Sequence, residues 1–263
     1  MTRKIVVTSG KGGVGKTTIV SGLGYTLAKM GYKVLLIDMD FGLNNLDILM
    51  GIENKIVYDI IDVLEGKCLP KQALIQDFYE NNLYIFPSTH GFCRIRFGAV
   101  ELMAIIRELE REFDFILIDC PAGIDGGFRR AIECAKEFIV VTTPHLSAIR
   151  DADKTIANLK NTEFKPYLII NRARGDMMIE SKMLRIDSIS DTLNATLLGV
   201  IPEDDNVSIQ MLNGGMYDNS TSIQKSLNMI AKSLTSGELK IFDCEKRYKG
   251  ILGSIRKNFR KRG

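Results

Sequence analysis

The chain has 263 residues, of which 45% are apolar and 25% charged, and its formal net charge is +3. This balance is typical of a globular protein and excludes disordered and collagen-like chains. The five cysteines are odd in number and contain no C-x-x-C pair, which argues against a disulfide framework or a zinc knuckle. No apolar stretch approaches the roughly 18 residues of a spanning helix, and the run before the glycine-rich loop is too short for the apolar core of a signal peptide. We therefore expect a cytoplasmic protein with reduced thiols.

Seven short apolar runs follow one another along the chain, and each has the length of a strand. They are nearly continuous rather than alternating, as in parallel strands that are covered on both faces. Segments with helical spacing lie between them, such as the one with Val100, Met103, Ile106 and Leu109. This alternation predicts a doubly wound α/β domain, with a mostly parallel sheet of about seven or eight strands and helices on both faces. The runs span residues 5–7, 34–37, 83–86, 115–118, 138–141, 167–170 and 197–201.

A glycine-rich loop follows the first run and precedes a helical segment. It satisfies the pattern G-x-x-x-x-G-K-[ST], whose glycines let backbone N–H groups approach phosphate oxygens while the helix presents its positive end. Lys16 is expected to reach the β- and γ-phosphates, and the Thr17 hydroxyl to bind Mg²⁺. A glycine-rich turn that binds nothing is disfavoured, because pattern and context agree at every position. The expected phosphate-binding residues are Gly10, Lys11, Gly12, Gly13, Val14, Gly15, Lys16, Thr17 and Thr18.

Aspartates follow two of the runs at the edge where parallel sheets bind ligands. Asp38 and Asp40 come after the second run and lie on one side of the strand's extension. One of them could hold Mg²⁺ through water while the other orients the attacking water. Asp119 closes the fourth run as in a Walker B strand, and its carboxylate would touch the Mg²⁺ shell. Turn or cap formation is the alternative role for any single aspartate.

The sixth and seventh runs also end in polar residues at the same edge of the sheet. Asn171 and Arg172 follow the sixth run, and Pro202 and Glu203 follow the seventh. By elimination these four residues are candidates for reading the nucleotide base. Ordinary loop residues are an equally open interpretation.

Lys11 adds a second lysine to the loop, and K-G-G-V-G-K-T-T resembles the signature of the MinD/ParA family of deviant Walker A ATPases. The segment D-M-D-F-G-L-N-N-L-D, residues 38–47, resembles the MinD branch, as do the later motifs P-A-G-I, R-D-A-D and G-V-I-P-E-D. The resemblance spans nearly the whole chain. It implies a Mg²⁺-dependent ATPase that forms a homodimer with ATP, in which Lys11 reaches the partner's nucleotide.

The same resemblance assigns further roles residue by residue. It implies that Lys11 and Lys16 are the catalytic lysines, that Asp40 positions the hydrolytic water and that Asp38 supports Mg²⁺. Asn45 would lie near the dimer seam. Asp151 and Asp153 would fall on the surface that receives a division inhibitor of the MinC type and, where one exists, an activator of the MinE type.

The last residues are strongly basic and have helical spacing. Residues 245–263 carry eight Lys or Arg and one Glu, a net charge of +7, whereas the other 244 residues carry a net charge of −4. Such a basic helix with a narrow apolar stripe suits the headgroup boundary of an anionic membrane. A helix docked on the domain and a nucleic-acid-binding arm are the alternatives. The expected membrane residues are Tyr248, Ile251, Leu252, Ile255, Phe259, Arg256, Lys257 and Arg260.

We accordingly expect an ATPase domain over residues 1–237, a polar linker over 238–247 and a membrane-targeting tail over 248–263. The expected function is an ATP-dependent switch that binds reversibly to the inner face of the cell membrane and positions the division septum by recruiting an inhibitor. A flagellar-placement ATPase is the first alternative. A DNA-partitioning ATPase is the second, and no nucleic-acid partner is expected.

Overall fold

The computed structural model describes residues 1–41, 45–88, 97–159, 165–203 and 221–249. An eight-stranded sheet crosses this part of the molecule in the order β3-β4-β2-β5-β1-β6-β7-β8. All neighbouring strands are parallel except β3 and β4, which are antiparallel. The strands are β1 (Arg3–Thr8), β2 (Val34–Asp38), β3 (Ile75–Gln76), β4 (Leu83–Phe86), β5 (Phe115–Asp119), β6 (Glu137–Thr142), β7 (Tyr167–Ala173) and β8 (Thr196–Pro202).

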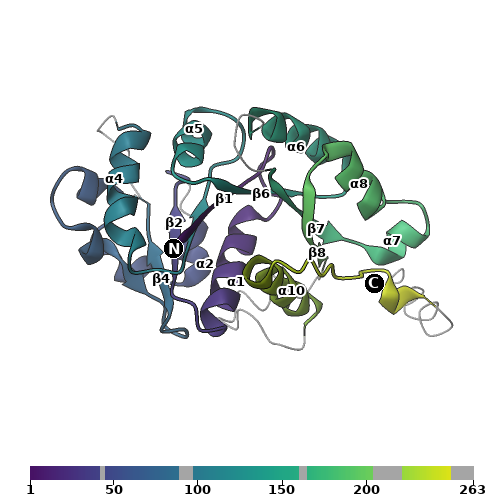
Figure 1. Ribbon diagram of the computed structural model, residues 1–263, viewed down its shortest axis with the longest axis horizontal. Helices are drawn as coiled ribbons and strands as arrows, with labels where there is room; N and C mark the ends of the chain where they lie inside the picture. The colour runs from purple at the N-terminus through teal and green to yellow at the C-terminus, as the bar shows by residue number, and fades with distance from the viewer. Residues whose placement is uncertain (42–44, 89–96, 160–164, 204–220, 250–263) are drawn as a thin grey trace.

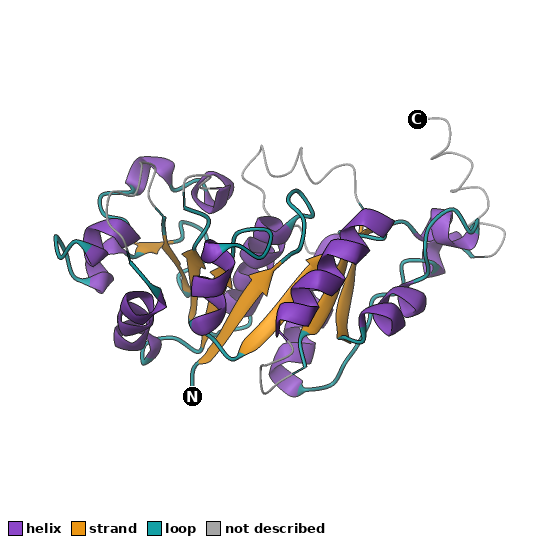
Figure 2. Ribbon diagram, turned by 90° about the horizontal axis from the view of Figure 1, so that it is seen from above, coloured by secondary structure: helices purple, strands orange, loops and turns teal. Residues whose placement is uncertain are grey.

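Helices cover both faces of the sheet, as Figure 2 shows. The doubly wound architecture expected from the alternating runs is therefore confirmed. Only β3 had no counterpart among the runs, because a two-residue strand is too short to leave a pattern. The helices are α1 (Lys16–Lys29), α2 (Asn45–Met50), α3 (Ile60–Leu64), α4 (Ala99–Glu110), α5 (Gly126–Glu133), α6 (Leu146–Leu159), α7 (Gly175–Ile179), α8 (Ile186–Leu193) and α10 (Ser222–Ser236), with short 3-10 turns η1 (Glu53–Lys55), η2 (Pro70–Ala73) and η3 (Lys246–Tyr248).

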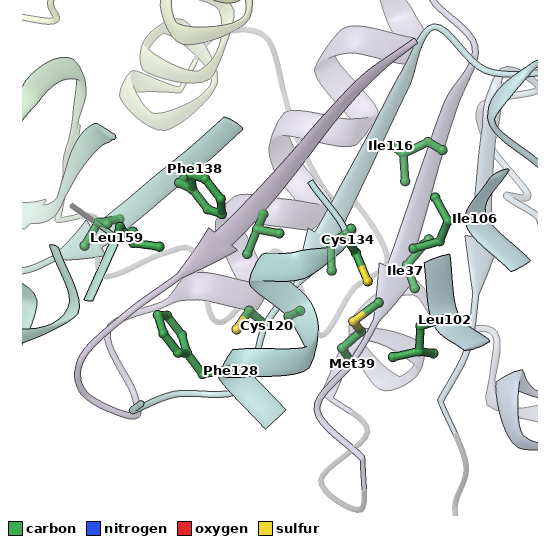
Figure 3. Close-up of a cluster of buried hydrophobic side chains, with 14 of the residues drawn as sticks. Ile37, Met39, Leu102, Ile106, Ile116, Cys120, Phe128, Cys134, Phe138 and Leu159 are labelled. Carbon is green, nitrogen blue, oxygen red and sulfur yellow. The ribbon is translucent and has the colours of Figure 1, made fainter. Parts of the chain in front are cut away.

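Alternate residues of each strand feed two separate cores. Val6 of β1 faces the core under α3, α4, α5, α6 and α8, whereas Ile5 and Val7 face the core under α1, α2 and α10. Because both faces are buried, the strands read as continuous apolar runs. Figure 3 shows the first core, to which Phe128 comes from α5, Phe138 from β6, and Leu102 and Ile106 from α4.

The buried face of helix α4 is not the face that its sequence predicted. Leu102, Ile105, Ile106 and Leu109 are buried, at the i, i+3, i+4, i+7 spacing of one helix face. Val100 is 71% exposed. Each three-residue step falls about 60° short of a full helix turn, so three such steps place Val100 and Leu109 about 180° apart, on opposite sides of the helix.

The segment after α10 is packed against the domain rather than forming a free linker. We call residues 238–249 the clasp. Cys244 is 4% exposed and Tyr248 is 7% exposed. They lie beside α7, where the yellow end of the ribbon passes in Figure 1. The expected boundary between linker and tail therefore differs from the structure, in which ordered packing continues to η3. In the described ranges, no helix is long and apolar enough to cross a bilayer.

The two faces of α4 give a matched test of this packing. Ile106→Ala should lower the free energy of unfolding by about 2–5 kcal/mol, because it leaves a cavity in the core. Val100→Ala on the same helix should change it by less than about 0.5 kcal/mol. Urea unfolding followed by circular dichroism measures both. Equal effects of the two substitutions would contradict the observed burial of α4.

Candidate active site

The phosphate loop connects β1 to α1 and presents an uncapped helix start. Gly15 precedes α1 in a left-handed conformation, at φ 90°, and no side chain caps the helix. The first turn of α1 also contains no acidic residue. The positive end of a 14-residue helix is thus left for an external anion, which is the condition that phosphate binding requires.

Close packing explains why two of the loop positions must be glycine. A Cβ at Gly10 would overlap the backbone carbonyl of Asp151 on α6, and one at Gly15 would overlap the side-chain amide of Asn171. Gly12 and Gly13 instead face open space. The loop is therefore held tightly at both ends and is open in the middle, as a cradle for a phosphate chain needs to be.

Lys16 and Asp119 form a buried ion pair behind the loop. Their Nζ and Oδ1 atoms are 2.9 Å apart, and the two side chains are 8% and 1% exposed. Burial alone would lower the pKa of Lys16, but attraction to Asp119 outweighs it and raises that pKa. Burial raises the pKa of Asp119 against the opposing effects of Lys16 and Thr17. The pair joins the lysine of the loop to the Walker B carboxylate.

Asp38 lies beside Asp119 because β2 and β5 are adjacent and in register. The two residues are Cα partners at the ends of their strands. Asp38 is 2% exposed, and burial together with repulsion from Asp119 raises its pKa to about 7. One of its oxygens accepts a 2.8 Å hydrogen bond from the Asp40 backbone N–H. Two neighbouring buried carboxylates with one lysine leave an excess of negative charge.

This excess of negative charge suits a small divalent cation. Thr17, Asp38 and Asp119 offer hard oxygen ligands, which Mg²⁺ prefers. Among the described residues no three His, Cys, Asp or Glu side chains form a closed metal site. Mg²⁺ at a nucleotide is usually held by one or two carboxylates together with the phosphates. The residues present therefore fit Mg²⁺ held together with a nucleotide.

Asp40 and Lys11 lie at the rim of this buried cluster. Asp40 is half-buried and close enough to Lys16 and Asp119 to raise the pKa of both. Lys11 is exposed, and its ammonium donates a 3.1 Å hydrogen bond to the Ser147 hydroxyl on α6. In the single chain the Lys11 side chain thus points to α6 and not into the phosphate loop.

The expected base-reading residues lie together, and one of them supports the phosphate loop. The Asn171 side chain donates a 2.8 Å hydrogen bond to the Val14 carbonyl and accepts one from the Arg172 N–H. Arg172 has a left-handed φ of 56°. Pro202 is the register partner of Ala173, whose carbonyl accepts from the Glu203 N–H at 3.1 Å.

No sequence motif indicated Arg174 and Asp176, two charged residues that follow β7. Arg174 pairs with the buried Asp176 at 2.8 Å and lies 4.0 Å from Glu203. They follow β7 without any motif, and only the folded chain brings Arg174 and Glu203 together.

The remaining expected residues are distributed more widely. Asn45 is exposed at the start of α2, and Asp153 is exposed on α6, while Asp151 is half-buried beside Gly10. Tyr248 is packed in the clasp and so is not available to a membrane-facing stripe in this conformation. The other expected membrane residues lie outside the described residues: Ile251, Leu252, Ile255, Arg256, Lys257, Phe259 and Arg260.

Comparisons with known proteins agree with this geometry. Residues 5–215 match the family described as the CobQ/CobB/MinD/ParA nucleotide binding domain. The septum site-determining protein MinD of Synechocystis is 41% identical over 261 residues, covering 98% of each chain. The MinD of an Aquifex aeolicus MinC:MinD cell division complex is similar in structure, with a TM-score of 0.82, 37% identity and coverage of 90% of this chain and 96% of that one.

A further solved structure bears on the ligand. MinD of Pyrococcus horikoshii, in complex with Mg-ADP, has a TM-score of 0.80 and 31% identity, covering 89% of this chain and 96% of that one. The family match covers most of the chain, and the phosphate loop, the buried carboxylates and the sheet topology are consistent with it. The chain belongs to the MinD/ParA nucleotide-binding family, is similar to MinD proteins over most of its length, and is a P-loop ATPase.

Proposed function

We propose that this ATPase is a dimerising switch that binds the inner face of the cell membrane and positions the division septum by recruiting a division inhibitor of the MinC type. The observation that carries the proposal is the open phosphate loop backed by the buried Lys16–Asp119 pair, in a chain similar to MinD over nearly its full length. The Aquifex complex of MinD with MinC supports the choice of partner.

The buried charges define the chemistry at the loop. Lys16 neutralises phosphate charge, and its ion pair with Asp119 keeps it at the base of the loop. Thr17, Asp38 and Asp119 would hold Mg²⁺, which offsets the negative charge that develops on the transferred phosphoryl group. Asp40 is at the rim, where it can orient a water molecule toward the terminal phosphate and accept its proton.

The exposed Lys11 supports the dimer part of the proposal. Its ammonium bonds the Ser147 hydroxyl at 3.1 Å, and an exposed contact of this kind contributes little stability. Turning away from Ser147 is therefore inexpensive, and the lysine can reach a nucleotide held by a second copy. ATP would in this way join two chains, as the family resemblance implies.

The basic tail supports the membrane part. Each Lys or Arg near an anionic surface adds about 1 kcal/mol, whereas ordering the backbone costs on the order of 1–2 kcal/mol per residue. A single tail should thus bind weakly. Two tails on one dimer bind far more tightly, because the second contact is intramolecular. ATP binding then favours the membrane-bound state, and hydrolysis releases it.

Lys16→Ala should abolish nucleotide binding, because it removes the phosphate ligand and leaves Asp119 buried without its 2.9 Å partner. Titration with a fluorescent ATP analogue measures the affinity. Lys11→Ala is the matched control on the same loop, and it should retain binding of one nucleotide per chain while losing ATP-dependent dimerisation. Retained affinity in Lys16→Ala would refute the loop assignment.

Asp40→Ala should give a dimer that holds ATP and hydrolyses it slowly, by about 10²-fold or more, because the group that orients water is missing. Phosphate release measures turnover, and size-exclusion chromatography with ATP measures the dimer. Normal turnover would move the water-positioning role to another residue.

Deletion of residues 250–263 should abolish ATP-dependent binding to anionic vesicles and leave nucleotide affinity unchanged. Co-sedimentation with vesicles and with DNA, each with ATP and with ADP, measures both classes of partner in one experiment. Vesicle binding that survives the deletion would contradict the membrane proposal, and ATP-dependent DNA binding would favour the partitioning alternative.

A further inference from the structure

We infer that the clasp, residues 238–249, is a positioning element of the nucleotide site, and that it holds the irregular end of β7 at Asn171 and Arg172, here called the nucleotide turn, in its binding conformation. Its polar composition is typical of a linker, and no motif points to a role in binding. The inference rests on the proposed function only in one respect, which is that the Asn171–Arg172 turn contacts the nucleotide.

Apolar packing fixes the clasp to the end of the sheet. Cys244 is buried in a small cluster with Ala173, Met178 and Val200, which come from β7, α7 and β8. Ile241 and Phe242 pack on the same cluster. Its members thus come from the elements that follow and flank the nucleotide turn, so the clasp completes the packing of that end of the domain.

A backbone contact makes the position of the clasp and that of the turn interdependent. Gly175 is the first residue of α7 and directly follows Arg174. A Cβ at this position would overlap the backbone carbonyl of Cys244. The start of α7 therefore touches the main chain of the clasp with no intervening side chain, so neither can move toward the other without displacing it.

From this contact, a short run of β7 leads to the phosphate loop. Ala173 accepts the Glu203 N–H at 3.1 Å, and Asn171 donates to the Val14 carbonyl at 2.8 Å. Only Arg172, Ala173 and Arg174 thus separate Gly175 from Asn171, the residue that is bonded to the phosphate loop. A displacement of the clasp would therefore be transmitted along the chain to Asn171 and Arg172, and through the Ala173–Glu203 hydrogen bond to Glu203.

Surface charges contribute less to holding the clasp. Glu245 lies 3.8 Å from Arg185 and 3.1 Å from Lys249, and both basic side chains are more than half exposed. Exposed pairs of this kind stabilise weakly. The anchors are therefore Cys244 and Tyr248, which are buried, and the contact with Gly175.

The coupling must act in both directions. If the clasp favours the binding conformation of the turn, nucleotide must stabilise the clasp by the same factor. The burial of Cys244 provides a probe of that stability, because its thiol reacts only when the clasp opens. Position 175 provides the perturbation: Gly175 lies outside the left-handed region, so alanine there adds a clash with the clasp and no backbone strain.

The test compares Gly175→Ala with Gly126→Ala in the full-length chain. Gly126 is also the first residue of a helix, α5, but a Cβ there meets only the Arg130 guanidinium at an ordinary 3.7 Å. Gly175→Ala should weaken ADP binding about fivefold and raise the KM for ATP with little change in kcat. Gly126→Ala should leave the affinity as it is. Calorimetric titration and steady-state hydrolysis measure these values.

Maleimide labelling of Cys244, located by peptide mass, gives a second readout that a purely structural role would not change. ADP should slow the labelling in the unsubstituted chain, and Gly175→Ala should speed it. Tyr248→Ser should behave like Gly175→Ala, and Tyr248→Phe should restore the original rate and affinity by keeping the ring in place.

Unchanged affinity in Gly175→Ala together with faster labelling would overturn the inference, because the clasp would then have moved without affecting the site. Labelling that ADP leaves unchanged would overturn it as well. Loss of ADP binding in the unsubstituted chain would instead refute the proposed nucleotide function, so the two failures are distinguishable.

Discussion

The buried ion pair between Lys16 and Asp119 is the interaction on which the site depends. It joins the first residue of α1 to the last residue of β5, across neighbouring strands of the sheet. Removing one partner of such a pair costs on the order of 3–5 kcal/mol, because the other charge remains buried. Asp38 adds a second buried carboxylate in register with Asp119. The site is thus electrostatically incomplete without added positive charge, which explains why Mg²⁺ and nucleotide suit it together.

The fold places all of these groups at one edge because the sheet is parallel. Every strand that carries a site residue ends at the same side, where the helix start and the polar turns also lie. The clasp packs at the same edge, against Ala173 at the end of β7. One end of the domain therefore carries the phosphate loop, the candidate base-reading residues and the root of the basic tail. In the proposed switch, nucleotide and lipid act on parts of the chain that touch.

Much of this could be predicted from local patterns. Continuous apolar runs indicated buried parallel strands, and the glycine-rich motif between a strand and a helix indicated the phosphate loop. The buried face of α4 was harder to predict, since Val100 fits a three-residue spacing and yet is 71% exposed. The packing of residues 238–249 could not be predicted from the sequence either. Its apolar residues are few and irregular, and they become a core only against Ala173, Met178 and Val200.

The sequence by itself determined the strand and helix order, the phosphate loop and the identity of the aspartates, because these depend on neighbours in the chain. Tertiary structure alone decided that Asp38 and Asp119 are adjacent, that Asn171 supports Val14, and that Arg174 faces Glu203. It also decided that Tyr248 packs on the domain, although the sequence assigns it to the basic tail. The physical reason is the same in each case. Strand order and close packing bring together residues that are far apart in the chain, and no local sequence pattern predicts such contacts.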